Sequence, residues 1–399
     1  MAFDASTFRA RIDLLGALDP NSQIFGAMRH RWRFSPALGS GEVLRFGGLI
    51  GSELPADYRS YLVELGNGGA GPYYGIEPLE IWEQGGSHPS RPFPLTSAYK
   101  NGDALPEGAH PHDGCIRLSE IGCGYQAFLV VRGDRAGEVW DDYLAGDGDF
   151  AKVADDFGSW MHRWADQTLR QTVFEAIDAA LLDPPWKESP ALIDASAAVD
   201  ELLDESAGAW LEQAMAAAYR GDREQARAAT ERAEPDLDFT KWIRGRATLA
   251  GLWVALGELG RAREVVAPAL SEARLDFQTR AACTVAMALA TEGDATEAWV
   301  KAREARPFEL SNRVRLALSH ERAGRSKEAD SVLAEAAREV RLFDGGTTRE
   351  GNSLKRAVYE RMAALCAHVG LDGARFIAIA TEVPKGPSGW GNPGNTKSW

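Results

Sequence analysis

The sequence predicts a protein of two parts, an N-terminal α+β domain followed by an all-α array of helical repeats. The prediction comes from a change of composition near residue 185. Before it, Gly and Pro are frequent and apolar runs are short, as in strands joined by turns. After it, Ala, Leu, Glu and Arg dominate, and apolar residues recur three and four positions apart, as in helices. A chain of 399 residues also exceeds what one ordinary hydrophobic core holds together.

A proline-rich segment from Asp183 to Pro190 marks the change, because its three prolines stop a helix and stiffen a connector. The end of the chain, from Pro384 to Trp399, is rich in Gly, Pro and Ser and cannot form a core. It is either a disordered tail or an extended segment that docks in a groove. We therefore predict an α+β recognition domain, a linker, a helical repeat domain and a flexible tail, over residues 1–182, 183–198, 199–383 and 384–399 respectively.

The elements of the first domain follow from local patterns. A helix opens at Leu54 and has Tyr58, Tyr61, Leu62 and Leu65 on one face, and the glycines of the GNGGAG segment end it. Short apolar runs predict strands, and a five-residue turn with a glycine between two of them predicts a β-hairpin. Aromatic residues three and four apart predict the closing helix. The predicted strands cover residues 115–118, 127–131 and 137–140, the hairpin turn residues 132–136, and the closing helix residues 157–169.

A small signature repeats in the second domain. A glycine is followed five residues later by a small side chain, with Gly221, Gly260, Gly293 and Gly324 spaced by 39, 33 and 31 residues. We interpret each unit as a helical hairpin in which the glycine makes the turn and the small residue allows close packing. Such units cannot bury their apolar faces alone, so neighbouring units must stack. In spacing and period they resemble tetratricopeptide repeats, although the usual aromatic residue of the first helix is poorly kept.

The first domain resembles the SUKH superfamily in the segments Leu54–Leu79 and Gly114–Asp142 and in the closing FGSWMHRW motif. The resemblance covers roughly residues 40 to 170 and implies a mixed sheet with flanking helices that binds another protein. Bacterial members of the superfamily commonly neutralise toxins, and others are scaffolds or regulators. The fused repeat array is a departure from single-domain immunity proteins and favours a regulatory or scaffolding role as the alternative.

Charge and cysteine content exclude several classes of function. The formal net charge of −14 without a basic stripe argues against direct nucleic-acid binding. No apolar stretch is long enough for a membrane span, and the first residues do not resemble a signal peptide. Because the four cysteines are scattered, we expect no disulfide framework and a cytoplasmic location.

The densest cluster of reactive side chains runs from His110 through His112, Asp113 and Cys115 to Cys123. Its spacing is not a usual zinc pattern, and a second ligand pair is missing. Cys123 as a nucleophile would need a cationic neighbour, whereas Glu120 is nearby. We therefore expect a polar loop and buried cysteines, with no metal, cofactor or catalytic residue. An enzyme or metal site between His110 and Cys123 is the weak alternative.

The stretch from Asp134 to Asp156 holds eight acids against two bases. One interpretation is a solvated rim; the sharper hypothesis is an acidic surface that docks on the basic cleft of a toxin acting on nucleic acid. Aromatic residues near the glycine segment could anchor the same interface. The residues predicted for partner binding are Tyr73, Tyr74, Trp140, Asp141, Asp142, Asp147 and Asp149.

The sequence therefore predicts a cytoplasmic, non-catalytic binding protein without cofactors, membrane contacts or direct nucleic-acid contacts. Its most concrete form is an immunity protein that neutralises a cognate toxin, with a basic toxin domain as the expected partner. The alternative is a regulatory or scaffolding adaptor in which both domains contact proteins.

Overall fold

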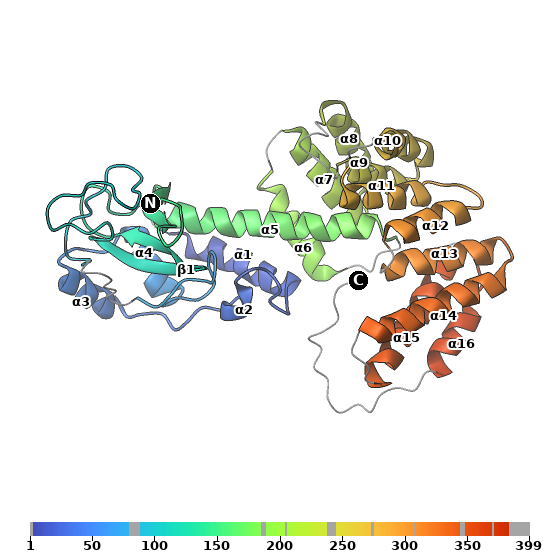
Figure 1. Ribbon diagram of the computed structural model, residues 1–399, viewed down its shortest axis with the longest axis horizontal. Coiled ribbons are helices and arrows are strands. Elements are labelled where there is room, and N and C mark those ends of the chain that lie inside the picture. Colours follow the sequence, from blue (N-terminus) through green and yellow to red (C-terminus); the bar gives the residue numbers. More distant parts are fainter. Residues whose placement is uncertain are drawn as a thin grey trace. The chain divides into compact units, whose positions relative to one another are not determined.

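The computed structural model describes residues 3–79, 88–184, 189–203, 206–237, 245–272, 275–306, 309–343, 348–368 and 371–382. The chain divides into two compact units, an N-terminal unit over Met1–Val173 and a C-terminal unit over Phe174–Trp399. The division falls inside one continuous helix, α5 (Phe157–Leu181), which is longer than the sequence indicated (Figure 1). Much of the predicted linker is also helical, in α6 (Pro190–Asp200). The predicted tail lies outside the described residues.

The N-terminal unit combines helices with one antiparallel sheet, so the prediction of an α+β domain is confirmed. Its strands run in the order β1-β2-β3-β4, each antiparallel to the next, so the expectation of a mixed sheet is wrong for the described residues. The predicted hairpin is present as β2 and β3, whereas β4 and the first three helices were not predicted. The elements are α1 (Ala5–Leu18), α2 (Ala27–His30), α3 (Ser40–Ile50), α4 (Ala56–Glu64), β1 (Cys115–Gly122), β2 (Tyr125–Val130), β3 (Val139–Asp142) and β4 (Phe150–Ala154).

Both faces of the sheet are buried at β2 and β3, so a polar residue in these strands is not necessarily exposed to solvent. Alternate residues of a strand point to opposite faces. Phe128 and Trp140 face one another across β2 and β3 and join Phe150 in a core under the loop that precedes β1. Their neighbours Leu129 and Val139 are fully buried on the other face. Polar residues in these strands are therefore enclosed and need partners inside the protein.

Aromatic side chains hold the helices of the N-terminal unit together. Tyr58 and Tyr61, as predicted from one face of the helix, are fully buried and pack against Phe157 with ring centroids 4.9 and 5.3 Å away. Asp57 accepts a hydrogen bond from the backbone N–H of Gly158, 2.8 Å away, at the start of α5. The carboxylate thus stabilises a helix N-terminus whose first amides have no partner within the helix.

The C-terminal unit is all-α, as predicted, and consists of α6 and stacked helical hairpins (Figure 1). Among the described residues, each hairpin packs its two helices against each other and against the next hairpin. The paired helices are α7 (Ala207–Tyr219) with α8 (Arg223–Ala233), α9 (Gly245–Ala255) with α10 (Leu259–Ser271), α11 (Phe277–Leu289) with α12 (Thr296–Ala305), α13 (Leu310–Arg322) with α14 (Ser326–Phe343), and α15 (Thr348–His368) with α16 (Ala374–Glu382). A 3₁₀ turn, η1 (Glu234–Asp236), follows α8.

Glycines in the left-handed conformation make the hairpin turns, but one assigned glycine was wrong. Gly221, Gly257, Gly293 and Gly324 have φ angles of 81, 82, 73 and 73°, so successive turns are 36, 36 and 31 residues apart. Gly260 instead lies within α10. The buried residue five positions after Gly257 is Ala262, which matches Ala226 and Ala329 of the neighbouring hairpins. The period is therefore more regular than the sequence suggested.

Arginines tie successive hairpins together at these turns. Arg223 at the start of α8 donates to the carbonyl oxygens of Ala255 and Leu256 at 3.0 and 2.7 Å, where α9 ends. In the next pair, Arg263 of α10 donates to the carbonyl of Ala290 at 3.3 Å, after α11 ends. These bonds satisfy carbonyl groups that have no partner within their own helix.

The chain's own residues 178–184 lie against the first helices of three hairpins. Asp178 accepts a hydrogen bond from Thr248 of α9 at 2.6 Å. Asp183 accepts from Arg315 of α13 at 2.7 Å and from Arg361 of α15 at 2.9 Å. Burial alone would raise the pKa of Asp183, but the two guanidinium groups outweigh it and lower the pKa. This part of the array therefore holds the end of α5 and the residues that follow it.

The corrected turn assignment can be tested with two glycine substitutions in the full-length chain. We expect Gly257→Ala to destabilise the chain by about 1–2 kcal/mol, because alanine must adopt a left-handed conformation. We expect Gly260→Ala to be neutral or stabilising by up to about 1 kcal/mol, because it replaces a helical glycine facing open space. Urea denaturation measures both, and the opposite order of the two midpoints would contradict the assignment.

Candidate protein-binding surface

The structure places three of the predicted partner-binding residues inside the N-terminal unit. Trp140, Asp141 and Asp142 are 1, 3 and 9% exposed. Asp142 lies 2.9 Å from Nε2 of His112 and accepts from the backbone N–H of Leu144 at 2.7 Å. These residues therefore do not belong to the solvated rim or acidic docking surface that the sequence suggested.

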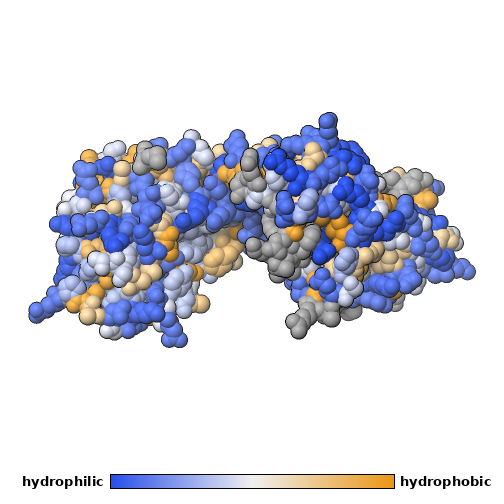
Figure 2. All heavy atoms as spheres, turned by 90° about the horizontal axis from the view of Figure 1, so that it is seen from above, coloured by the Kyte–Doolittle hydropathy of each residue, from blue (hydrophilic) through white to orange (hydrophobic). Residues whose placement is uncertain are grey.

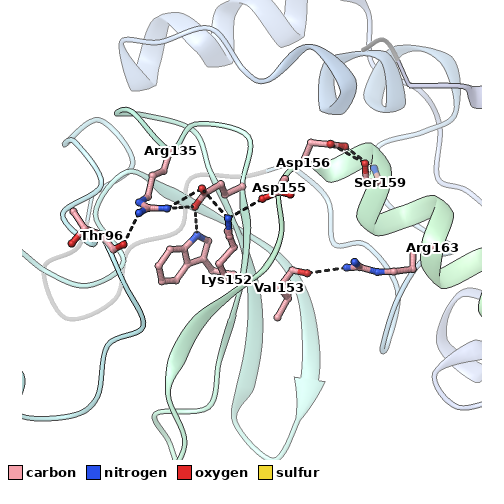
Figure 3. A network of polar contacts seen from close by, with 10 residues as sticks. Thr96, Arg135, Lys152, Val153, Asp155, Asp156, Ser159 and Arg163 are labelled. Atoms are coloured by element: carbon pink, nitrogen blue, oxygen red, sulfur yellow. Dashed lines mark hydrogen bonds and ion pairs between the residues drawn. The ribbon is translucent and has the colours of Figure 1, made fainter.

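A polar network occupies the region where the acidic surface was expected (Figure 3). Glu138 accepts hydrogen bonds from Nε1 of Trp140 at 2.9 Å and from Arg135 at 3.0 Å. Lys152 on β4 lies 3.6 Å from Glu138 and 2.8 Å from Asp155. The carboxylates are thus matched by cations from neighbouring strands and turns, which favours a structural role.

Asp156 and Arg163 extend this network to α5. Asp156 accepts from the backbone N–H and the hydroxyl of Ser159 at 2.7 and 2.8 Å (Figure 3). Arg163 donates to the carbonyl oxygen of Val153 at 2.8 Å. The network therefore anchors the first turn of α5 beside β4.

Asp147 and Asp149 are the predicted acids that stay nearer the solvent. Asp147 is exposed, whereas Asp149 is half-buried and lies 3.4 Å from Nζ of Lys100. Because Lys100 pairs with Asp149, Asp147 and Asp149 do not form a concentrated negative surface. The basic-partner hypothesis thus loses most of the residues on which it depended.

The His–Cys cluster is divided by β1. His112 precedes the strand and stacks on Phe128 with centroids 4.6 Å apart, while Cys123 follows its other end. Asp113 accepts from the backbone N–H groups of His88 and His110 at 2.8 and 2.9 Å, as loop carboxylates do. Across the described part of the chain, no group of three or more His, Cys, Asp or Glu side chains is arranged to hold a metal.

Tyr73 and Tyr74 point in opposite directions. The hydroxyl of Tyr73 donates to the buried carboxylate of Asp141, and its ring lies 6.3 Å from that of Trp160. Tyr74 instead contacts Phe25 with ring centroids 5.0 Å apart. Both tyrosines are half-buried, and Tyr74 is the one that lies against the exposed side chain of Phe25.

Around Tyr74 lies a surface that the sequence did not reveal. Phe25 and Met28 are 63 and 70% exposed. The guanidinium group of Arg29 lies 4.9 Å above the ring of Tyr74 and 2.7 Å from Glu120. We call Phe25, Met28, Arg29, Tyr74 and Glu120 the Tyr74 surface. On the face seen in Figure 2, hydrophilic residues cover most of the surface and hydrophobic residues form smaller areas between them.

Strained backbone concentrates next to this surface. Outside glycine, the described residues with φ between 50 and 58° are Ser22, Arg31, Trp32, Tyr73 and Cys123. Each left-handed non-glycine residue costs of order 1 kcal/mol or more and persists only where surrounding contacts enforce it. All five lie in the segment around α2, beside Tyr74, or in the turn after Gly122. Clustered strain of this kind is typical of functional sites.

Glycines and one buried carboxylate enforce the geometry. Gly26 has φ of +82°, and a Cβ there would overlap the carbonyl oxygen of Tyr73. A Cβ on Gly122 would come within 3.2 Å of the Tyr74 ring. Asp19 accepts from the backbone N–H of Gln23 at 2.7 Å and from Nε1 of Trp32 at 3.2 Å. These contacts fix the segment that carries Phe25 and Met28.

A second apolar area lies on α3, where Leu44 and Leu49 are 62 and 66% exposed. Beside them is a hollow of about 300 Å³ whose lining includes Gly47, Gly48 and Leu54. Within the described chain no left-handed non-glycine residue lies in α3. The α3 area therefore lacks the strained backbone conformations found beside the Tyr74 surface.

No protein-family model matches the chain, and no curated protein matches it. Within the described residues, no helix is both long and apolar enough to cross a membrane.

The buried carboxylate of Asp141 gives a pH-dependent prediction. Burial raises the pKa of Asp141, and hydrogen bonds from Tyr73 and Tyr143 only partly oppose this. The folded chain therefore binds this proton more tightly than the unfolded chain, so the stabilising contribution is present at low pH and is lost as the pH rises. We expect the stability of Asp141→Asn, relative to the parent, to increase between pH 4 and pH 7.

Urea midpoints over this pH range measure the effect. Asp147→Asn serves as the control, because its exposed side chain carries no comparable burial penalty. A difference between Asp141→Asn and the parent that does not change with pH would show that the Asp141 charge is not destabilising in the fold.

Proposed function

We propose that this protein is a non-catalytic binding protein whose N-terminal unit recognises another protein through the Tyr74 surface. The observation that carries the proposal is the exposure of Phe25 and Met28 on a backbone that internal contacts hold in strained conformations. Large apolar side chains rimmed by polar residues are typical of protein interfaces. Here Arg29 and Glu120 supply part of that rim.

Preorganisation supports this proposal over an incidental exposure of two apolar residues. A loop that is already ordered loses less conformational entropy on binding than a mobile loop does. The hydrogen bonds of Asp19 and the close packing of Gly26 on Tyr73 supply this order. These contacts thus hold a strained backbone in the conformation that shapes the accessible surface.

We propose a supporting role for the C-terminal unit. Its contacts with Asp178 and Asp183 bind the end of α5 and the residues that follow it, so this part of the array contacts the chain itself. The alternative function of a regulatory adaptor is favoured by Phe277, which is 69% exposed at the start of α11 and could contact a second protein.

The most concrete form of the proposal is an immunity protein of the SUKH type that neutralises a toxin in the cytoplasm. In that form the tetratricopeptide-like array is a scaffold, and the protein acts by occupying a surface of the toxin without turnover. Its support is the resemblance of Leu54–Leu79 and Gly114–Asp142 to that superfamily, together with the Tyr74 surface.

Site-specific crosslinking tests the proposal in the organism that carries the gene. A photoreactive amino acid replaces Met28 in the full-length chain, and Leu49 of α3, which is similarly exposed, is the matched control position. We expect a discrete adduct with one protein from position 28 and none of that size from position 49. No adduct from position 28 above the control would contradict the proposal.

The crosslinked protein then allows a quantitative test. We expect Phe25→Ser together with Met28→Ser to weaken its binding by at least about 100-fold, the size of effect found at interface hot spots. Leu44→Ser together with Leu49→Ser controls for the loss of exposed apolar area and should leave binding unchanged. If the adduct protein is a toxin, co-expression of the parent chain should also relieve its toxicity, and the Phe25/Met28 variant should not.

A further inference from the structure

We propose that the Tyr74 surface takes an acidic segment of the partner protein, in which carboxylates flank an apolar side chain. The inference rests on the proposed function and adds the chemistry of the partner. It comes from three exposed arginines within five residues, Arg29 of the Tyr74 surface and Arg31 and Arg33, which follow it in the chain. An acidic partner thus stands in place of the basic toxin domain that the sequence suggested.

The strained backbone has a specific effect on these arginines. Arg31 and Trp32 have consecutive left-handed φ angles of 50 and 58°. Trp32 turns inward, where it is 8% exposed and donates its indole N–H to Asp19, while Arg31 and Arg33 on either side remain in solvent. The conformation therefore buries the tryptophan and presents both guanidinium groups.

Two of the three arginines of this segment are not neutralised by an ion pair within the described residues. Neither Arg31 nor Arg33 has an ion-pair partner among the residues that the structure describes. Arg29 pairs with Glu120, yet its side chain is still 53% exposed. Burial lowers the pKa of His30 to about 4, so this imidazole is neutral at pH 7 and adds no charge. The excess positive charge therefore comes from the arginines.

Charge complementarity selects the partner chemistry. The chain has a net charge of −14, so an uncompensated basic segment is an exception on its surface. Guanidinium groups bind carboxylates through paired hydrogen bonds. Phe25 and Met28, exposed in the same chain segment, offer apolar contact area. A nucleic acid fits less well, because tight binding draws on about six to ten phosphate contacts and the acidic chain repels the rest of the backbone.

Fluorescence anisotropy with synthetic probes tests the inference on the full-length protein. The probes are a labelled 15-residue peptide of Glu and Asp interrupted by Leu and Phe, its counterpart with Lys at each acidic position, and a single-stranded 15-nucleotide DNA. The test variant is Arg31→Glu with Arg33→Glu. The control, Arg45→Glu with Lys327→Glu, makes the same change in net charge at exposed positions elsewhere.

We expect the acidic peptide to bind the parent and the control, and to bind the Arg31/Arg33 variant about tenfold more weakly or worse. Added salt should weaken binding to the parent. Arg31→Gln with Arg33→Gln removes charge without reversing it and should give an intermediate loss. Circular dichroism and urea midpoints establish whether each variant is folded. If the variant with Glu at positions 31 and 33 does not fold, the binding of the variant with Gln at both positions tests the inference.

Failure of the acidic peptide to bind, or binding that is unchanged in both arginine variants, would overturn the inference. Binding of the basic peptide that depends on Phe25 and Met28 would also overturn it, while the proposed protein-binding function would stand. Binding of the DNA at least as tightly as the acidic peptide, with loss in the arginine variants, would assign the surface to nucleic acid instead. The proposed function itself is contradicted by a different result, the absence of a crosslinked adduct from position 28.

Discussion

The close approach of Gly26 to the backbone of Tyr73 is the constraint on which the candidate surface depends. No other residue type fits there, because a Cβ would overlap the Tyr73 carbonyl oxygen and φ is +82°. The contact holds the segment around α2 against the turn that carries Tyr73 and Tyr74. The backbone N–H of Tyr74 in that turn donates to the carbonyl oxygen of Glu120 on β1 at 3.2 Å. Phe25 and Met28 are thereby held outward beside the sheet.

The two tyrosines on this segment connect the surface to the core. Tyr74 contributes to the exterior, and the adjacent Tyr73 donates to Asp141 inside. Two energetically unfavourable features thus lie in contact, the left-handed backbone of Tyr73 and the buried carboxylate of Asp141 with its raised pKa. Neither feature helps stability, which is why we interpret them as consequences of fixing the shape of a binding surface.

Local patterns were enough to predict much of the fold. The helix with Tyr58 and Tyr61 on one face, the hairpin of β2 and β3, and the all-α second part follow from periodicity and turn residues, which act over a few positions. The turn glycine was misassigned because Gly257 and Gly260 lie only three positions apart, and Val265 was accepted in the alanine's place. The left-handed φ angle of Gly257 and the buried Ala262 five positions after it identify the turn.

The candidate site could not be predicted to the same extent, for two physical reasons. Asp141 and Asp142 were assigned to a solvated rim or an acidic docking surface because acids outnumber bases from Asp134 to Asp156. In the fold both faces of the sheet are covered, and Tyr73 and His112 contact the two carboxylates. The segment from Phe25 to Arg33 has no periodic pattern, since α2 has only four residues. Its shape arises from tertiary contacts, and only the run of alternating arginines gave a local signal.

Hydrogen–deuterium exchange of the full-length protein, alone and bound to the protein captured through position 28, tests the central claim most directly. If recognition uses the Tyr74 surface, amide exchange should slow on binding in residues 22–33 and 72–76. Protection confined to residues 134–149, where the sequence placed an acidic docking surface, or to α3, would contradict it.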